Sequence, residues 1–270
     1  MTPPEPYACS DAWPWPVKVL TLGSLELYKH DQPVMFPSRV QRKPLGLLTT
    51  LIAFGGRRVR EQRLIDALWA DAPGDKGRFA LTTAIHRLRR LLGDDAAILR
   101  QDSEVSVNTQ VAWVDAMALQ TLLERAEAMR SQDTMDWDRF RDVVTSITRL
   151  HRGPFLADND GAPYAVRTRK TLETRVLAQI MRLGQHLEPS DPAAASELYE
   201  QARNLDPCSE DACRHLMMCY QRLGRAADRD RVYDWCRESL AAELAATPSP
   251  ETQAVWRRLR YGAGLHGNTS

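Results

Sequence analysis

Residues 78–92, RFALTTAIHRLRRLL, place basic and hydroxyl side chains at helical spacing. At roughly 100° per residue, the aliphatic side chains share one arc of a helix: Leu81, Ala84, Ile85, Leu88 and Leu92. The opposite arc carries Thr83, His86, Arg87 and Arg90. Arginine presents a planar fork of donors that matches guanine edges and phosphates, and threonine offers a hydroxyl and a methyl that can meet thymine. The segment predicts a recognition helix, and the alternative is a surface helix with a solvated basic face.

Two further helices are predicted upstream of this basic helix. Residues 44–54 open with a proline near the first turn and end at Gly55 and Gly56. Residues 61–70 form a shorter helix, with Trp69 off its apolar stripe. A connection at residues 71–77, polar and containing glycine and proline, then leads into the basic helix.

Short β-like runs flank the three helices. Residues 98–100 and 105–107 enclose a polar turn at Asp102 and Ser103, and a hairpin after a recognition helix is a wing. Short strands are also expected at residues 17–22, 25–28 and 34–36. Together these elements predict a winged helix-turn-helix domain over residues 17–110, with a small N-terminal antiparallel sheet.

From residue 111 onward the pattern is entirely helical. Tyr199 and Tyr233 stand 34 residues apart, which is the tetratricopeptide period. Residues 182–184 and 222–224 both read Arg-Leu-Gly. Such helical pairs stack because none can bury its apolar face alone, and stacking leaves a groove for a protein or ligand. We therefore expect a mainly α protein with an all-α tetratricopeptide-like domain at residues 111–262 and a flexible tail at 263–270; the alternative is that these helices only hold a dimer or a scaffold together.

The order of these elements resembles the SARP family of antibiotic-regulatory-protein activators. In that family, a response-regulator-type winged-helix domain precedes a bacterial transcriptional activator domain. The resemblance covers residues 17 to 260 and rests on five stretches: 63–69 (RLIDALW), 85–92 (IHRLRRLL), 114–115 (VD), 152–156 (RGPFL) and 248–252 (PSPET).

The resemblance implies roles for individual side chains. Arg87 occupies the base-reading position, Thr83 the position of an apolar base contact, and Arg89 a position near phosphate. Trp69 matches a tryptophan whose indole N–H can donate to a phosphate. The wing of relatives usually carries a Gly-Tyr-Arg-like sequence, whereas residues 102–106 read DSEVS, so minor-groove contact rests on Arg100.

The predicted DNA-binding set is Trp69, Arg78, Thr82, Thr83, His86, Arg87, Arg89, Arg90 and Arg100. His86 is often arginine in relatives, and its partial charge near neutral pH implies a weakly pH-dependent affinity. Several of these residues keep a structural alternative. Trp69 could be a packing aromatic, Arg78 could only solvate a loop, and Thr82 could pack against the wing. Arg89 could instead pair with Glu61 or Asp66.

The net charge of the chain is +1, but its distribution is uneven. Residues 1–110 hold 15 Lys and Arg against 12 Asp and Glu, and the remainder holds 21 against 23. Residues 57–90 alone hold 9 basic against 4 acidic side chains. The excess of positive charge thus coincides with the predicted DNA face, as an electrostatic footprint requires.

Other classes of function find little support. Residues 1–16 contain five prolines and no signal-peptide run, so they are interpreted as a linker or tether. No run of 18 apolar residues predicts a membrane helix, and a cytoplasmic location is expected. The five cysteines, Cys9 among them, lack the spacing of a metal site or disulfide framework. No phosphate-binding loop, HExxH or GxSxG motif is present, and neither an enzyme nor a cofactor is expected.

The sequence therefore predicts a DNA-binding transcriptional regulator. It would bind double-stranded promoter DNA through residues 78–92, and the resemblance implies a homodimer on direct repeats and engagement of RNA polymerase through the helical repeats. The alternative is a helical-repeat scaffold, or the output module of a larger signalling regulator, in which the winged helix serves protein interaction. No residue pattern identifies a small-molecule effector.

Overall fold

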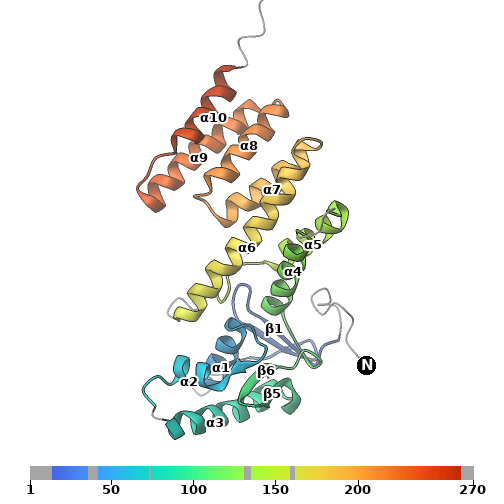
Figure 1. Ribbon diagram of the computed structural model, residues 1–270, viewed down its shortest axis with the longest axis vertical. Helices are drawn as coiled ribbons and strands as arrows, with labels where there is room; N and C mark the ends of the chain where they lie inside the picture. Colours follow the sequence, from blue (N-terminus) through green and yellow to red (C-terminus); the bar gives the residue numbers. More distant parts are fainter. Residues whose placement is uncertain (1–13, 36–41, 73, 131–134, 159–161, 263–270) are drawn as a thin grey trace, which may run out of the picture. The chain divides into compact units, whose positions relative to one another are not determined.

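The computed structural model describes residues 14–35, 42–72, 74–130, 135–158 and 162–262 (Figure 1). Most of the predicted linker, with Cys9, lies outside these residues, as do Phe36 and the predicted tail. Contacts divide the chain into two units, Met1–Met135 with Thr145–Leu172 (unit 1) and Asp136–Val144 with Glu173–Ser270 (unit 2). This division differs from the domain boundary that the sequence predicts after residue 110. The predicted boundary stays a proposal.

Unit 1 contains the winged helix. Its elements are β1 (Val17–Leu20), β2 (Glu26–Lys29), β3 (Gln32–Pro33), α1 (Arg42–Ala53), β4 (Val59–Arg60), α2 (Glu61–Leu68), α3 (Gly74–Leu92), a 3₁₀ turn (Asp95–Ala97), β5 (Ile98–Gln101), β6 (Glu104–Val107), β7 (Ala112–Val114) and α4 (Asp115–Met129). Figure 1 shows α1, α2 and α3 grouped together, with the β5–β6 hairpin beside α3. The predicted winged helix-turn-helix fold is confirmed.

Helix α3 begins at Gly74, earlier than the predicted start at residue 78. The sequence favoured a polar connection at 71–77 because glycine and proline are poor helix formers. Gly77 is buried, however, and a Cβ atom placed on it would lie 2.7 Å from the Ile65 side chain. This close packing between α2 and α3 extends the helix by one turn, so tertiary contact overrides local propensity.

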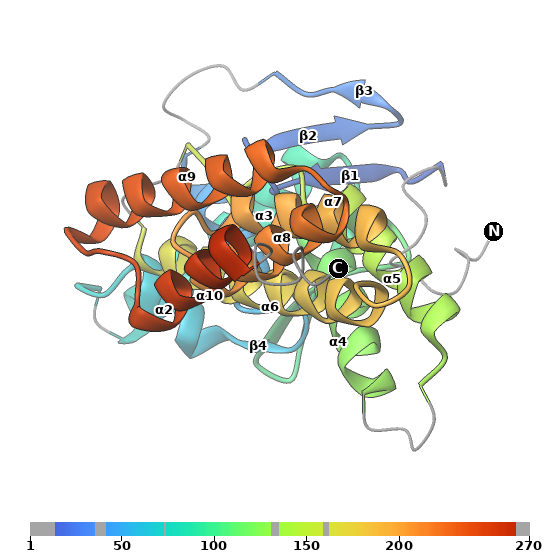
Figure 2. The same ribbon diagram turned by 90° about the horizontal axis from the view of Figure 1, so that it is seen from above.

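The N-terminal sheet has four strands in the order β3-β2-β1-β7. Figure 2 shows β3, β2 and β1 side by side. β1 pairs antiparallel with β2 but parallel with β7, so the sheet is mixed rather than wholly antiparallel. β7 lies in the part of the chain that was expected to be entirely helical, and this prediction was wrong. Ala112, Trp113 and Val114 are all buried, and periodicity cannot distinguish so short a buried strand from a buried helical turn.

The wing is a three-stranded sheet in the order β4-β6-β5. Its two-residue turn has φ of 52° at Asp102 and 60° at Ser103. Positive φ at both central residues is the feature of a type I′ turn, whose twist matches that of the flanking strands. The predicted hairpin and its turn are therefore confirmed.

The first residue of α4, Asp115, is a buried carboxylate that connects three segments of unit 1. It accepts hydrogen bonds from the Thr21 backbone N–H at 2.8 Å, the Thr21 hydroxyl at 2.8 Å and the Leu22 N–H at 2.9 Å, just after β1. It also accepts from the Ala116 N–H at 2.7 Å, and Arg152 Nη2 lies 3.6 Å from its Oδ2. Burial raises the pKa of the Asp115 carboxyl, and the hydrogen bonds from Leu22, Thr21 and Ala116 oppose that rise.

Residues 152–156 reinforce the same junction. The Leu156 N–H donates to the Thr21 carbonyl at 2.7 Å, and the Gly23 N–H donates to the Pro154 carbonyl at 3.0 Å. Arg169, on α6, holds this segment in turn by donating to the carbonyls of Phe155 and Leu156. The RGPFL stretch therefore functions as an added edge of the winged-helix unit.

The remaining helices are α5 (Trp137–Leu150), α6 (Pro163–Leu187), α7 (Pro192–Leu205), α8 (Glu210–Arg222), α9 (Ala226–Leu244) and α10 (Pro250–Tyr261). α5 and α6 cross the division between the units. Side-chain oxygens of Asp191, Ser209 and Ser249 accept backbone hydrogen bonds at the starts of α7, α8 and α10. Within unit 2, the helices α7 to α10 stack side by side (Figure 1), which confirms the predicted helical-repeat domain.

The two halves of the predicted repeat are not equivalent. The Arg-Leu-Gly stretch at 182–184 lies inside α6. Its Gly184 packs against Tyr199, which is fully buried, and a Cβ on Gly184 would lie 2.7 Å from the Tyr199 ring. Gly224, with φ of 70°, instead follows the end of α8. Tyr233 is half-buried and stacks on Trp256 with ring centroids 4.4 Å apart. Tyr199 is thus a core residue and does not line a groove.

We expect Asp115→Asn to destabilise the protein by about 3 kcal/mol, because its amide nitrogen would face buried N–H donors. Urea denaturation measures the loss, and hydrogen exchange at the Thr21 and Leu22 amides localises it to the junction. Glu124→Gln, an exposed change on the same helix, is the matched control. Equal stability of the two variants, with unchanged exchange at Thr21, would mean that the carboxylate does not secure this junction.

Candidate nucleic-acid interface

Helix α3 separates its side chains as the sequence predicts. The aliphatic side chains are buried: Leu81, Ala84, Ile85, Leu88 and Leu92. The exposed set is Arg78, Phe79, Thr82, His86, Arg87 and Arg90, and Thr83 is half-buried. None of the four basic side chains in this set forms an ion pair with a described residue. The basic face is therefore available for an external anion.

Phe79 belongs to this face and was missed in the sequence. Its side chain is 76% exposed, which is unusual for a phenylalanine. It precedes Thr83, His86 and Arg90 by four, seven and eleven residues, so it lies on their arc of the helix. The signal for Phe79 in the sequence is its spacing, which places an apolar residue on the polar arc and outside the buried stripe.

Arg89 holds the base of the wing. Its Nε and Nη2 donate to the Ile98 carbonyl at 3.1 and 2.7 Å. The alternative pairing with Glu61 or Asp66 is not formed, because Arg100 pairs with Glu61 and Gln62 donates to Asp66 at 2.7 Å. These bonds use Nε and Nη2, so a phosphate contact by Arg89 would use Nη1 or replace the bonds to Ile98.

Arg100 connects the wing to both α2 and α3. Its Nε and Nη2 donate to Glu61 at 2.6 and 3.0 Å, and its Nη1 donates to the Thr82 hydroxyl at 2.9 Å. The Thr82 hydroxyl donates in turn to the Arg78 carbonyl at 2.9 Å. The hydrogen bond that Arg100 donates to Glu61 raises the pKa of Arg100. In this arrangement Arg100 and Thr82 position the wing, and a minor-groove contact by Arg100 stays a prediction.

The acidic wing is partly neutralised within the protein. Arg58 Nε lies 2.8 Å from Glu104, while Asp102 remains exposed at the turn. Next to this pair, Arg57 and Arg60 are exposed at β4, and no described residue forms an ion pair with them. Arg57 and Arg60 thus add exposed positive charge to the wing sheet, with Arg60 opposite Glu104 and next to the turn.

Trp69 lies directly after α2. Its backbone N–H donates to the Ile65 carbonyl at 2.8 Å, and its side chain is half-buried. Arg63, on the same helix, covers the Phe54 ring with its guanidinium carbon 3.9 Å from the centroid. A cation held over an aromatic ring is less available for phosphate, so Arg63 has a packing role here.

Other kinds of site are not supported among the described residues. No group of three or more His, Cys, Asp or Glu side chains in this part of the chain could hold a metal ion. Cys213, Cys219 and Cys236 are buried within unit 2. None of the described helices is long and apolar enough to cross a bilayer.

The structure combines a mixed sheet, a three-helix core, a wing and helical repeats. This is the architecture of a transcriptional regulator with a winged-helix domain. The family model of the bacterial transcriptional activator domain matches residues 114–260, more than half of the chain. The chain belongs to this family, and it is a regulator of the SARP type.

Relatives agree with this assignment. The chain is 29% identical over 244 residues to the regulatory protein AfsR of Streptomyces griseus, covering 90% of this chain and 24% of AfsR. It is 27% identical over 217 residues to the transcriptional regulator RedD of Streptomyces coelicolor, covering 75% of this chain and 59% of RedD. The chain thus spans about a quarter of AfsR and somewhat more than half of RedD.

A solved structure supports the fold. Mycobacterium tuberculosis EmbR, in complex with a low-affinity phosphopeptide, superposes with a TM-score of 0.62 at 21% sequence identity. The match covers 91% of this chain and 65% of that chain. At this identity the likeness concerns the fold alone.

Two adjacent arginines on α3 offer a matched test. Arg89→Ala leaves the Ile98 carbonyl without this donor, and we expect a loss of about 1 to 2 kcal/mol in the free energy of unfolding. Arg90→Ala removes an exposed, unpaired side chain and should change it by no more than about 0.5 kcal/mol. Chemical denaturation of both variants measures the difference. Equal losses would contradict the role assigned to Arg89.

Proposed function

We propose that this chain binds double-stranded promoter DNA by placing α3 in the major groove. The observation that carries the proposal is the exposed face of α3, where Arg78, Arg87 and Arg90 have no acidic partner among the described residues. The major groove is roughly 12 Å wide and admits an α-helix, and arginine reads guanine through paired donors. Arg57 and Arg60, at the wing, extend the positive surface over which a phosphate backbone would pass.

Within this proposal, the side chains of α3 divide into base-reading and phosphate-binding groups. Arg87 reads a base, and Thr83 and Phe79 supply methyl and aromatic surface for a thymine methyl group. Arg78, His86 and Arg90 contact phosphate or neighbouring base edges, and Trp69 donates its indole N–H to a phosphate. Arg89, Arg100 and Thr82 act mainly by fixing the wing against α3, since Nε and Nη2 of Arg89, the three guanidinium nitrogens of Arg100 and the Thr82 hydroxyl already have partners.

We further propose that the bacterial activator domain recruits RNA polymerase. Family membership supports this role, and the segment after residue 110 has a slight acidic excess, 23 against 21, unlike the basic segment 57–90. A protein partner therefore suits it better than DNA. Binding as a homodimer on direct repeats would place two such domains beside the polymerase, and a cytoplasmic location accords with this role.

A second candidate is that the chain corresponds to the output module of a larger regulator. The observation in its favour is that the match spans 24% of each AfsR protein. In that case the winged helix could serve protein interaction within a scaffold. The two candidates differ in one property, since only a DNA-reading module loses affinity for DNA steeply with salt as counterions are released.

We expect Arg87→Ala to weaken binding to the operator by about 1 to 3 kcal/mol, the value of a bidentate base contact. The operator is first recovered by sequencing genomic fragments that the purified full chain retains. Fluorescence anisotropy then compares operator with scrambled DNA for the wild type, Arg87→Ala and the control Arg139→Ala, an exposed arginine on α5. Unchanged discrimination in Arg87→Ala would refute the base-reading role. A wild-type affinity independent of salt would support the scaffold instead.

Transcription in a purified system tests the activator role. With RNA polymerase and an operator template, the full chain should raise transcript yield severalfold, because it would hold the polymerase at the promoter. Arg87→Ala should activate less at limiting protein and recover when its concentration restores occupancy, since its activator domain is intact. Footprinting reports occupancy in the same reactions. A fully occupied operator without increased transcription would overturn the recruitment proposal.

A further inference from the structure

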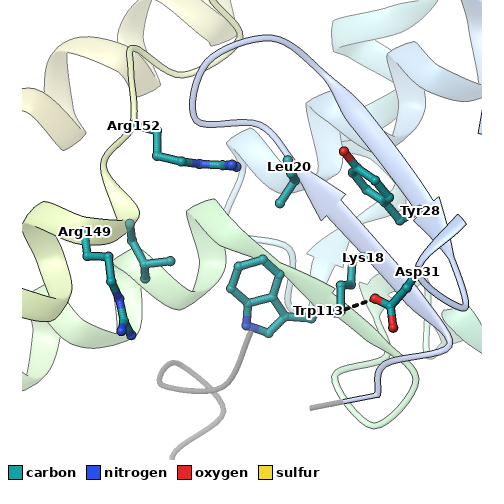
Figure 3. A pocket seen from close by; sticks show the side chains of 8 residues that line it. Lys18, Leu20, Tyr28, Asp31, Trp113, Arg149 and Arg152 are labelled. Atoms are coloured by element: carbon teal, nitrogen blue, oxygen red, sulfur yellow. Dashed lines mark hydrogen bonds and ion pairs between the residues drawn. The ribbon is translucent and has the colours of Figure 1, made fainter. Parts of the chain in front are cut away.

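A cavity of about 400 Å³ opens on the face of the N-terminal sheet in unit 1 (Figure 3). No residue of α3 and none of the predicted DNA-binding residues lines it. Its size falls within the range typical of small-molecule sites, about 300 to 1,000 Å³. Figure 3 shows Trp113 in the middle of the lining, with Arg149 and Arg152 to one side and Lys18, Asp31 and Tyr28 to the other.

The strand register explains how the sheet side of this cavity forms. Lys18 pairs with Tyr28 on β2 and with Trp113 on β7, so the three side chains stand in one row across the sheet. Leu20, two residues after Lys18, lies on the same face because side chains alternate along a strand. Leu150, the last residue of α5, adds a second aliphatic group opposite. The lining therefore combines a flat indole with aliphatic surface.

The charged side of the cavity is positive. Arg149 is exposed, and no described residue forms an ion pair with it. Arg152 is about half exposed, and its closest carboxylate, Asp115, is 3.6 Å away, beyond normal hydrogen-bond distance. The one carboxylate in the lining, Asp31, is already neutralised by Lys18 at 2.6 Å. Two guanidinium groups thus remain to receive an anion.

Trp113 provides an independent indication of a ligand. Its side chain is 2% exposed, yet its indole N–H finds no hydrogen-bond acceptor among the described residues. A buried donor without an acceptor costs stability, and such groups are rare in folded proteins. An acceptor atom on a molecule bound in the cavity would satisfy it.

We propose that this cavity binds a small organic anion with a flat apolar body. The body would lie against the Trp113 ring, Leu20 and Leu150, and the anionic head would lie between Arg149 and Arg152, with one of its oxygens accepting from the Trp113 indole N–H. Arginine pairs with carboxylate and phosphate heads alike through two parallel N–H bonds, so either head fits the same place. The proposal is independent of DNA binding, since it involves none of the residues of α3.

The position of the cavity gives the ligand access to the junction held by Asp115. Arg152 belongs to both, and Trp113 is two residues before Asp115 in the chain. A bound anion would therefore order the end of β7 and the segment at 152–156. Since the activator-domain match begins at residue 114, the ligand would act where the two parts of the regulator join.

Calorimetric titration of the full chain tests this proposal with three probes that share one ring system. They are 2-naphthoate, 2-naphthyl phosphate and the neutral 2-naphthamide. At least one anion should bind ten or more times tighter than the amide, and Arg149→Gln should abolish most of that preference. Arg139→Gln, an exposed arginine on the same helix, should leave it unchanged.

Two further measurements separate a site from non-specific attraction. Leu20→Trp fills the cavity and keeps both arginines, so it should weaken binding of the anions at least tenfold. The indole N–H resonance of Trp113, assigned with Trp113→Phe, should shift downfield when the anion binds. The proposal fails if neither anion binds at millimolar concentration, if the amide binds equally well, or if Arg149→Gln and Leu20→Trp bind like the wild type.

Discussion

The Asp115 carboxylate is the interaction on which the arrangement of unit 1 depends. It accepts hydrogen bonds from Thr21, Leu22 and Ala116, and thereby ties the end of β1 to the start of α4. Desolvating a carboxylate is costly, and this cost is offset only because several donors converge on it. The parallel pairing of β1 with β7 follows, since β7 enters α4 directly at this residue. Residues 152–156 then add to the same edge through the Thr21 carbonyl.

The Asp115 junction lies where the activator-domain match begins in this chain. The activator-domain match begins at residue 114, but the residues at its start complete the sheet of the winged-helix unit. A cut after residue 110 would remove β7 and Asp115 together, leaving β1 paired only with β2 and exposed as an edge strand. The two modules are therefore joined by a shared core as well as by the chain. Function tests with the full chain avoid this loss.

The arginines of the DNA-facing region differ in what the fold leaves available. Arg89 and Arg100 are committed to Ile98 and Glu61, and so they set the distance between α3 and the wing. Arg78, Arg87 and Arg90 are exposed and have no acidic partner among the described residues. A rigid frame that presents a few uncommitted arginines reduces the conformational freedom lost on binding, which is how preorganisation favours affinity.

Local patterns in the sequence predicted what depends on local chemistry. The 3.6-residue period of apolar residues predicted the buried arc of α3, and the polar pair Asp102 and Ser103 predicted the wing turn. No local pattern in the sequence predicted the contacts between distant segments. Thr21 and Asp115 are 94 residues apart, and Glu61 and Arg100 are 39 apart, so neither partner could be identified from spacing. β7 was not predicted for the same reason. Its three-residue apolar run forms a strand only because β1 lies beside it.

The cavity beside β1 shows how one long-range contact can serve both stability and recognition. Asp115 is satisfied by Thr21, Leu22 and Ala116 without Arg152, whose nitrogen is 3.6 Å away. Arg152 can therefore turn toward an anion in the cavity without leaving a buried charge uncompensated by hydrogen bonds. Had the carboxylate depended on Arg152 alone, ligand binding would compete with folding. The surplus of donors at Asp115 is what makes this arginine available for a ligand.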